Sequence, residues 1–198
     1  MSAGPRIGIF GGTFDPIHVG HLVAAVNVRH ALALDRLLLV VANVPWQKSG
    51  LRSITAAEDR FALVSAAVGD VEGVEASRLE LDRGGPSYTV DTVEEIARQF
   101  PSASLFCVVG ADVADVLGTW ERSDVIAELA TLVVVNRPGS VRTAPLDGWR
   151  VEEVEVPALE VSSTDLRARA ADGRPLDYLV PVGAIRCIRA RGLYAEGR

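Results

Sequence analysis

Short apolar runs rich in Val, Ile and Leu recur along this chain, separated by stretches of mixed polarity. The clearest runs are Ile7 to Phe10, Leu37 to Val41, Leu105 to Val109 and Thr131 to Val135. Continuous apolar runs of this length are typical of parallel strands that are buried on both faces. Weaker strands are predicted at Val74 to Leu79 and Arg150 to Val156.

Between these runs, apolar residues recur three or four positions apart, which is the period of an amphipathic helix. One example consists of Val90, Val93, Ile96, Ala97 and Phe100. Further helices are predicted over His21 to Leu32, Thr55 to Val68, Ser123 to Leu129, Thr164 to Ala171 and Val182 to Ala190. Because strands alternate with helices, the sequence predicts an α/β fold, with a doubly wound, mostly parallel sheet and helices on both faces.

The 198 residues are predicted to form a single domain, 1–198, whose part from about residue 160 to 198 supplies closing helices. The breaks at 83–86, 137–140 and 172–175 contain Gly and Pro but are too short to link domains. In open sheets of this kind, ligands bind at the carboxyl ends of the strands, where the strand order reverses. We therefore expect the chemistry just after the strands.

The charge balance narrows the classes of partner. The chain carries 26 acidic and 20 basic side chains, which gives no general attraction to nucleic acid or to anionic membranes. A phosphate site must then be built locally, from backbone N–H groups, helix N-termini and a few cationic side chains. Since no apolar run approaches the roughly 20 residues of a membrane span, and no secretory signal begins the chain, we expect a cytoplasmic protein. Cys107 and Cys187 are expected to be buried thiols rather than a disulfide.

The turn after the first strand carries the most chemical information. Residues 11–21 read GGTFDPIHVGH, and an apolar-periodic helix follows. The paired glycines allow close backbone approach, and His18 and His21 fall on one face of the helix's first turn. Together with the Thr13 hydroxyl and the helix amides, two imidazoles can surround phosphate oxygens and stabilise charge during displacement at phosphorus.

Other interpretations of this turn are a purely structural loop, a zinc site or a different nucleotide motif. A zinc site lacks ligands, because the remaining histidine, His30, is two to three turns along the helix and no cysteine cluster exists. A nicotinamide-dependent oxidoreductase would need G-x-G-x-x-G, and a P-loop would need G-K-[ST]; the turn contains neither.

The run GGTFDPIHVGH resembles the signature of the HxGH nucleotidyltransferase superfamily, which implies a Rossmann-like fold. The resemblance also implies that His18 and His21 contact the phosphates of ATP and that Thr13 lies near the reacting α-phosphate. These are the candidate catalytic residues. The candidate ATP-binding residues beside them are Gly11, Gly12 and Phe14.

A second motif, VSSTDLR at residues 161–167, opens a helix near the end of the chain. Ser162 with Asp165 fits a helix capping box, which is the structural interpretation. The run also resembles the second motif of the superfamily, usually I-S-S-T-x-x-R, with Val161 in place of Ile. That resemblance implies that the β- and γ-phosphates bind to Ser163, Thr164 and Arg167.

The middle of the chain indicates the acceptor. Residues 85–92, 110–112 and Trp120 resemble the nicotinate mononucleotide adenylyltransferases in order and spacing, and the resemblance covers nearly the whole chain. It implies that AMP passes from ATP to nicotinate mononucleotide in NAD biosynthesis. We expect Mg²⁺ to accompany ATP on its phosphates rather than to occupy a protein metal site. A phosphate is already a competent nucleophile, so in-line attack needs alignment and charge neutralisation.

Each residue of the mononucleotide side has a structural alternative. Trp120 offers a face for the pyridine ring, or it is a core residue. Thr89 lies where helix amides could bind the nicotinate carboxylate, or it is an N-cap. The resemblance places backbone N–H groups near both positions on that carboxylate, which favours the acid over the amide substrate. By resemblance Asp112 holds a ribose hydroxyl of adenosine; the alternative is a helix cap.

Two cationic residues complete the candidates. Lys48 matches a family lysine that faces phosphate, or it is a solvated surface lysine. The family often has Pro or His where Trp46 and Gln47 stand, so the resemblance does not specify the shape of this loop. Arg137, after the fifth strand, could meet the mononucleotide phosphate.

The rival functions are another HxGH adenylyltransferase, acting on phosphopantetheine or nicotinamide mononucleotide, and a non-catalytic nucleotide sensor. A fragment of an aminoacyl-tRNA synthetase is disfavoured by length and acidity. The sequence predicts small-molecule partners, with neither nucleic acid nor membrane among them, and leaves homo-oligomerisation open.

Overall fold

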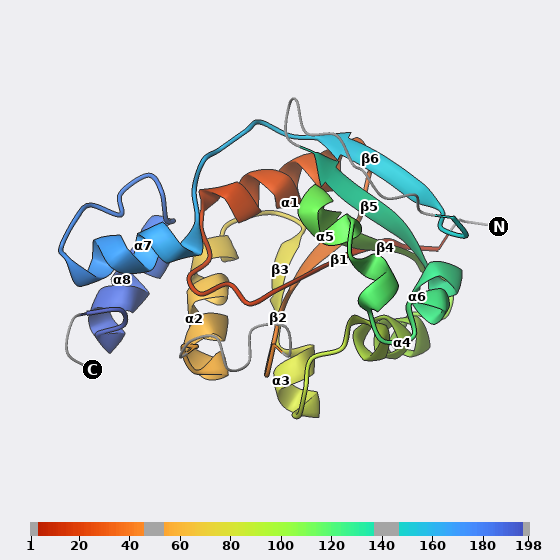
Figure 1. Ribbon diagram of the computed structural model, residues 1–198, viewed down its shortest axis with the longest axis horizontal. Helices are drawn as coiled ribbons and strands as arrows, with labels where there is room; N and C mark the ends of the chain where they lie inside the picture. The colour runs from red at the N-terminus through yellow and green to blue at the C-terminus, as the bar shows by residue number, and fades with distance from the viewer. Residues whose placement is uncertain (1–3, 46–53, 137–146, 196–198) are drawn as a thin grey trace.

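The computed structural model describes residues 4–45, 54–136 and 147–195, which form a central sheet flanked by helices (Figure 1). The strands are β1 (Arg6–Gly12), β2 (Arg36–Val41), β3 (Val74–Ser77), β4 (Ser104–Gly110), β5 (Ala130–Asn136) and β6 (Val151–Glu155). Their order is β3-β2-β1-β4-β5-β6, and every neighbouring pair is parallel. The order reverses between β1 and β4, so a ligand site is expected at their carboxyl ends.

The helices cover both faces of the sheet, as the sequence predicts (Figure 1). They are α1 (Val19–Ala31), α2 (Ala57–Val68), α3 (Leu79–Arg83), α4 (Thr89–Gln99), α5 (Ala111–Ala114), α6 (Ser123–Leu129), α7 (Ser163–Ala171) and α8 (Val182–Arg191), with a 3-10 turn at Leu117–Thr119. In β2, Leu37 and Leu39 pack on the side of α1 and α2, whereas Leu38 and Val40 pack on the side of α4 and α6. The doubly wound α/β prediction is confirmed.

One strand is shorter than predicted. The strand expected over Val74 to Leu79 ends at Ser77, and Leu79 begins the short helix α3 instead. A five-residue helix shows too little periodicity to be recognised in the sequence, and its apolar Leu79 extends the apparent strand. The turns of α5 and Leu117–Thr119 were missed for the same reason.

The C-terminal helices close one side of the molecule. α8 packs against α2 so closely that a Cβ on Gly183 would lie 2.2 Å from the Ala66 carbonyl oxygen. Arg191 of α8 also pairs with Asp59 of α2 at 2.6 Å. Within the described residues, no helix has both the length and the apolar character that crossing a bilayer requires.

Both cysteines are free thiols, as predicted, but only Cys107 is buried, whereas Cys187 is half-buried on α8. Burial raises the pKa of Cys107 to about 12. Its thiol therefore stays protonated near neutral pH and is a poor nucleophile.

Candidate active site

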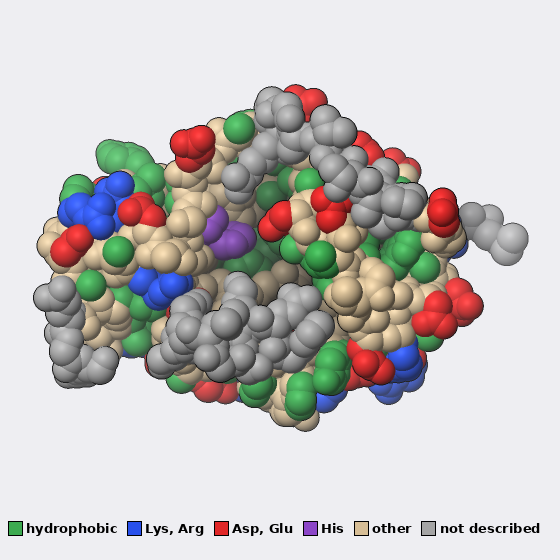
Figure 2. Space-filling model, in the orientation of Figure 1, with side chains coloured by type: hydrophobic (Ala, Val, Ile, Leu, Met, Phe, Trp, Pro, Cys, Tyr) green, Lys and Arg blue, Asp and Glu red, His purple; other side chains and the backbone are tan. Residues whose placement is uncertain are grey.

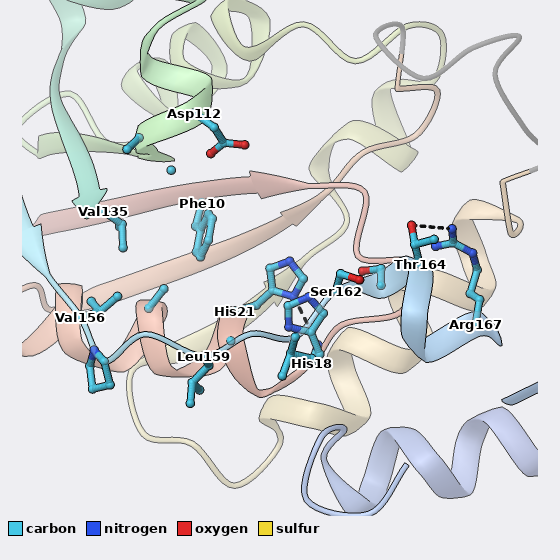
Figure 3. Close-up of a pocket in the computed structure, with 17 residues that line it drawn as sticks. Phe10, His18, His21, Asp112, Val135, Val156, Leu159, Ser162, Thr164 and Arg167 are labelled. Carbon is cyan, nitrogen blue, oxygen red and sulfur yellow. Dashed lines mark hydrogen bonds between the residues drawn. The ribbon is translucent and has the colours of Figure 1, made fainter. Parts of the chain in front are cut away.

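Two segments far apart in the sequence line one cavity of about 910 Å³ at the carboxyl edge of the sheet. The lining residues include His18 and His21 from the start of α1, with Ser163, Thr164 and Arg167 from the start of α7. Figure 3 shows Asp112 across the cavity from the two histidines, and Figure 2 shows histidine side chains at a hollow of this face. The structure thus brings the two candidate phosphate motifs together.

The two histidines form a stacked pair at the start of α1. Their ring centroids are 3.7 Å apart, and the backbone N–H of His18 donates to Nδ1 of His21 at 3.3 Å. Because Nδ1 accepts this bond, a neutral His21 carries its proton on Nε2. The partial positive charge of the helix N-terminus lies at the same place. An anion is therefore favoured beside this pair.

The second motif lies at the start of α7. Ser162 is the N-cap, and its hydroxyl accepts a hydrogen bond from the backbone N–H of Asp165 at 3.2 Å, which is one of the two bonds of the predicted capping box. Arg167 donates to the Thr164 hydroxyl at 3.2 Å. A cation and a hydroxyl thus lie side by side at the N-terminus of a nine-residue helix, which suits phosphate oxygens.

The two segments are bonded to each other as well as facing one cavity. The Ser163 hydroxyl donates to the Pro16 carbonyl at 2.9 Å, and Arg167 donates to the Asp15 carbonyl at 2.7 Å. Tyr194, beyond α8, donates to the Asp15 carboxylate at 2.8 Å. Burial, and the nearby charge of Asp15, raise the pKa of Tyr194 above its usual range. Sequence reasoning assigned no role to Asp15 and Tyr194, because their bond joins residues 179 positions apart.

A second cavity, of about 570 Å³, adjoins the first. The two share the lining residues Phe10, Gly110 and Asp112. Candidate residues on the wall of the smaller cavity are Gly11, Gly12, Thr13, Thr89 and Trp120. The site therefore has two compartments, each of the size of a small-molecule pocket, which meet at the switch point between β1 and β4.

The mononucleotide candidates lie where helix amides or an aromatic face are available. Thr89 is the first residue of α4, and the N-cap is Tyr88, whose side chain makes no capping hydrogen bond. The N-cap alternative for Thr89 is therefore wrong. Trp120 packs partly against the core on the α4 and α6 side and also lines the cavity. Its indole Nε1 is buried and finds no hydrogen-bond partner within the described part of the chain.

Asp112 lies in the first turn of α5, directly after β4, and the N-cap of that helix is Gly110. The cap alternative for Asp112 is therefore wrong too. A Cβ on Gly110 would lie 2.7 Å from Oδ1 of Asp112. The glycine thus allows the carboxylate to lie close to the strand end, at the junction of the two cavities.

Phe14 is a buried residue that contacts His21. It is 2% exposed and packs edge-on against His21, with ring centroids 5.1 Å apart. It does not appear among the described lining residues of either cavity. Lys48 and Arg137, together with Trp46 and Gln47, lie outside the described residues.

Two buried charged residues beside the site were not foreseen. Glu80 lines the smaller cavity, and the Thr92 hydroxyl donates to its carboxylate at 2.7 Å. Burial raises the pKa of Glu80, although hydrogen bonds from Ser87 and Thr92 oppose the shift. Arg60, on α2, is 1% exposed. Its position three and four residues before the buried Leu63 and Val64 was a signal that could have placed it on the inner face of that helix.

Comparisons with known proteins identify the family of this chain. The cytidylyltransferase-like family matches residues 9–169. A Corynebacterium kroppenstedtii protein named "Probable nicotinate-nucleotide adenylyltransferase" is 46% identical, covering 96% of this chain and 91% of its own length. A Streptomyces coelicolor protein of the same name is 48% identical, covering 93% of this chain and 98% of its own length.

A solved structure described as "Plasmodium falciparum nicotinic acid mononucleotide adenylyltransferase complexed with NaAD" has the same fold, with a TM-score of 0.78. It is 16% identical and covers 96% of this chain and 97% of its own. The family match and the sequence relatives together define a nucleotidyltransferase of the cytidylyltransferase-like class. Within that class, the chain belongs to the nicotinate-nucleotide adenylyltransferase family.

Proposed function

We propose that this protein transfers the AMP part of ATP to nicotinate mononucleotide, forming deamido-NAD and pyrophosphate in NAD biosynthesis. The observation that carries the proposal is the junction of two cavities at Phe10, Gly110 and Asp112, with both phosphate motifs on the wall of the larger cavity. ATP would occupy the larger cavity and the mononucleotide the smaller one, so that their phosphates meet at the junction.

The ATP phosphates would lie between the histidine pair and the start of α7. Ser163, Thr164 and Arg167 would hold the β- and γ-phosphates that leave as pyrophosphate, while His18 and His21 stabilise charge at the α-phosphate. Thr13 lines the smaller cavity and would contact the reacting phosphate from that side. Apolar residues of the larger cavity, such as Val135 and Val156, would contact the adenine, and Asp112 would accept a ribose hydroxyl.

The mononucleotide would use the start of α4 and the indole of Trp120. The first amides of a helix favour an anion, so the nicotinate carboxylate gains more there than a neutral amide does. Stacking of the pyridine on Trp120 would add about 0.5 to 1.5 kcal/mol beyond burial. Nicotinate mononucleotide is therefore the proposed acceptor. Lys48 and Arg137 stay candidates for phosphate contacts on sequence grounds.

The proposed step needs no covalent intermediate. One oxygen of the mononucleotide phosphate attacks the α-phosphorus in line, the bond to the β-phosphate oxygen breaks, and pyrophosphate leaves with that electron pair. Alignment of two bound anions supplies roughly 7 to 11 kcal/mol of barrier reduction. When bound, Mg²⁺ neutralises charge on the triphosphate. Among the described residues no three His, Cys, Asp or Glu side chains cluster as a metal site. The proposed ion would be carried mainly by ATP oxygens and water.

Three further parts of the proposal concern the protein as a whole. We expect it to act in the cytoplasm on small molecules, without nucleic acid or a membrane as partner. The assignment of residues 1–198 to a single domain stays a prediction, and homo-oligomerisation stays open.

A pyrophosphate-release assay tests the function. ATP and Mg²⁺ are supplied with nicotinate mononucleotide, nicotinamide mononucleotide or phosphopantetheine in turn. The proposal predicts release with nicotinate mononucleotide and a lower kcat/KM with the amide. Release with phosphopantetheine alone would identify a different adenylyltransferase, and the absence of release with every acceptor would favour a nucleotide sensor.

A further inference from the structure

Arg60 joins three separate segments of the backbone beneath the site. Its side chain is 1% exposed, and its guanidinium donates to three carbonyl oxygens. Nη1 reaches Thr13 at 2.8 Å, Nη2 reaches Asn43 at 3.1 Å and Nε reaches Thr55 at 2.7 Å. Thr13 belongs to the turn after β1, whereas Asn43 follows β2. Arg60 therefore connects the loops at two adjacent strand ends.

The chemistry of arginine suits this task. Its planar guanidinium presents five donors in a fixed fork, so that one side chain can reach several fixed acceptors, whereas the ammonium of lysine is a compact point donor. Burying a cation is costly, so a residue that only filled the core would be better apolar. The three bonds from Arg60 indicate that its role is to hold carbonyls in place.

The connection continues from Asn43 to the loop before α4. The backbone N–H of Asn43 donates to the Ser87 hydroxyl at 2.8 Å, and its side-chain amide donates to the Gly85 carbonyl at 2.9 Å. The backbone N–H of Ser87 donates in turn to the Val44 carbonyl at 3.0 Å. A continuous hydrogen-bonded path thus runs from the catalytic turn, through Arg60 and Asn43, to the loop that precedes Thr89.

We infer that Arg60 is a positioning residue, which fixes the catalytic turn relative to the loop on the mononucleotide side. The inference rests on the proposed function, because a transfer between two bound substrates requires the two sides of the site to hold a fixed relative position. A misplacement of about 1 Å can cost about 10²-fold in rate, while each substrate keeps its own direct contacts. Loss of Arg60 therefore lowers kcat about tenfold or more and changes the Kd of each substrate by less than about threefold.

The test compares Arg60→Met with Leu63→Ala. Leu63 is fully buried one turn along the same helix, so its truncation weakens the packing of α2 without cutting the hydrogen-bonded path. For each protein, kcat comes from pyrophosphate release, and the Kd values for α,β-methylene-ATP and nicotinate mononucleotide come from separate titrations. Arg60→Met should have a lower kcat than the wild type and similar Kd values for both ligands. Leu63→Ala should have a lower Tm than the wild type and a similar kcat.

Three results would overturn the inference: wild-type kcat in Arg60→Met, loss of both affinities in proportion to kcat, or an equal loss of kcat in Leu63→Ala. If Arg60→Met does not fold, Asn43→Ala at a half-buried position weakens the same path, because it removes the bond from the Asn43 side-chain amide to the Gly85 carbonyl and leaves the backbone bonds of Asn43 in place. It should lower kcat about threefold with unchanged Kd values, and unchanged kcat would contradict the inference. If the wild type releases no pyrophosphate with nicotinate mononucleotide, the proposed function fails and the inference fails with it.

Discussion

Tyr194→Phe removes one hydroxyl from the bond that ties the end of the chain to the signature turn. The Tyr194 hydroxyl donates to Oδ1 of Asp15 at 2.8 Å, and Asp15 is 1% exposed. A hydrogen bond to a charged group contributes about 1.5 to 3 kcal/mol, so the variant should lose about 2 kcal/mol of unfolding free energy. In a chain of 198 residues, this loss lowers Tm by about 4 to 8 °C.

The pH dependence of Tyr194→Phe gives a second, independent measurement. Burial and Asp15 raise the pKa of Tyr194 in the folded state, so its contribution to stability is complete below about pH 10, the pKa of tyrosine in an unfolded chain. Above that pH the unfolded chain releases the proton and the folded chain keeps it. Wild-type stability should therefore fall by up to about 1.4 kcal/mol per pH unit from this group, and the variant should lack that component.

Urea unfolding at pH 8 and at pH 10.5 measures both effects, and Tyr178→Phe is the matched control. Tyr178 is 95% exposed, so its hydroxyl should be dispensable for stability at both pH values. Equal stability of Tyr194→Phe and Tyr178→Phe at pH 8 would refute the conclusion that the Tyr194 bond stabilises the turn.

Three further substitutions test individual residues of the site. His18→Ala should lower kcat about 10²- to 10³-fold while changing the Kd for nicotinate mononucleotide little; equal losses in both would contradict charge stabilisation. Gly110→Ala should raise the KM for ATP about tenfold, because the new Cβ would lie 2.7 Å from the Asp112 carboxylate and would displace it from the ribose. Since this carboxylate is flexible, Tm should change little. An unchanged KM would show that the carboxylate does not hold the ribose. Because burial raises the pKa of Glu80, the unfolding free energy of the wild type should fall as pH rises from about 4.5 through the raised value. In urea unfolding at pH 4.5 and 7, the unfolding free energy of Glu80→Gln should fall less between the two pH values than that of the wild type. Parallel pH profiles of the two proteins would count against this explanation.

Much of the fold could be predicted because the pattern and the tertiary environment agree. Runs such as Leu37 to Val41 are apolar on both faces, and the structure buries them between two helical layers. The errors fell on α3 and α5, which have five and four residues. Elements of that length are set by the loops around them rather than by a periodic apolar face.

The candidate site, like the fold, could be predicted only in part from the sequence. His18, His21, Thr164 and Arg167 were identified because each belongs to a compact sequence motif, and the structure places them on one cavity. The supporting contacts were not identified, because they join residues distant in sequence. The bond from Tyr194 to Asp15 spans 179 positions, and a lone Arg within an alanine-rich helix is usually solvent-exposed.

Asp112 illustrates how local geometry decides between interpretations. Sequence alone left a helix cap and a ribose contact open for this residue. The structure gives the cap to Gly110 and leaves the Asp112 carboxylate on the walls of both cavities. The resemblance implies the contact of Asp112 with adenosine, and the position of Asp112 on both cavities leaves that contact possible.

A crystal structure with α,β-methylene-ATP and nicotinate mononucleotide would test the account most directly. The triphosphate should touch His18 or His21 on one side and Thr164 and Arg167 on the other, with the mononucleotide phosphate opposite the α-phosphorus. A nucleotide held by only one of these two segments, or bound away from the junction at Asp112, would contradict the account.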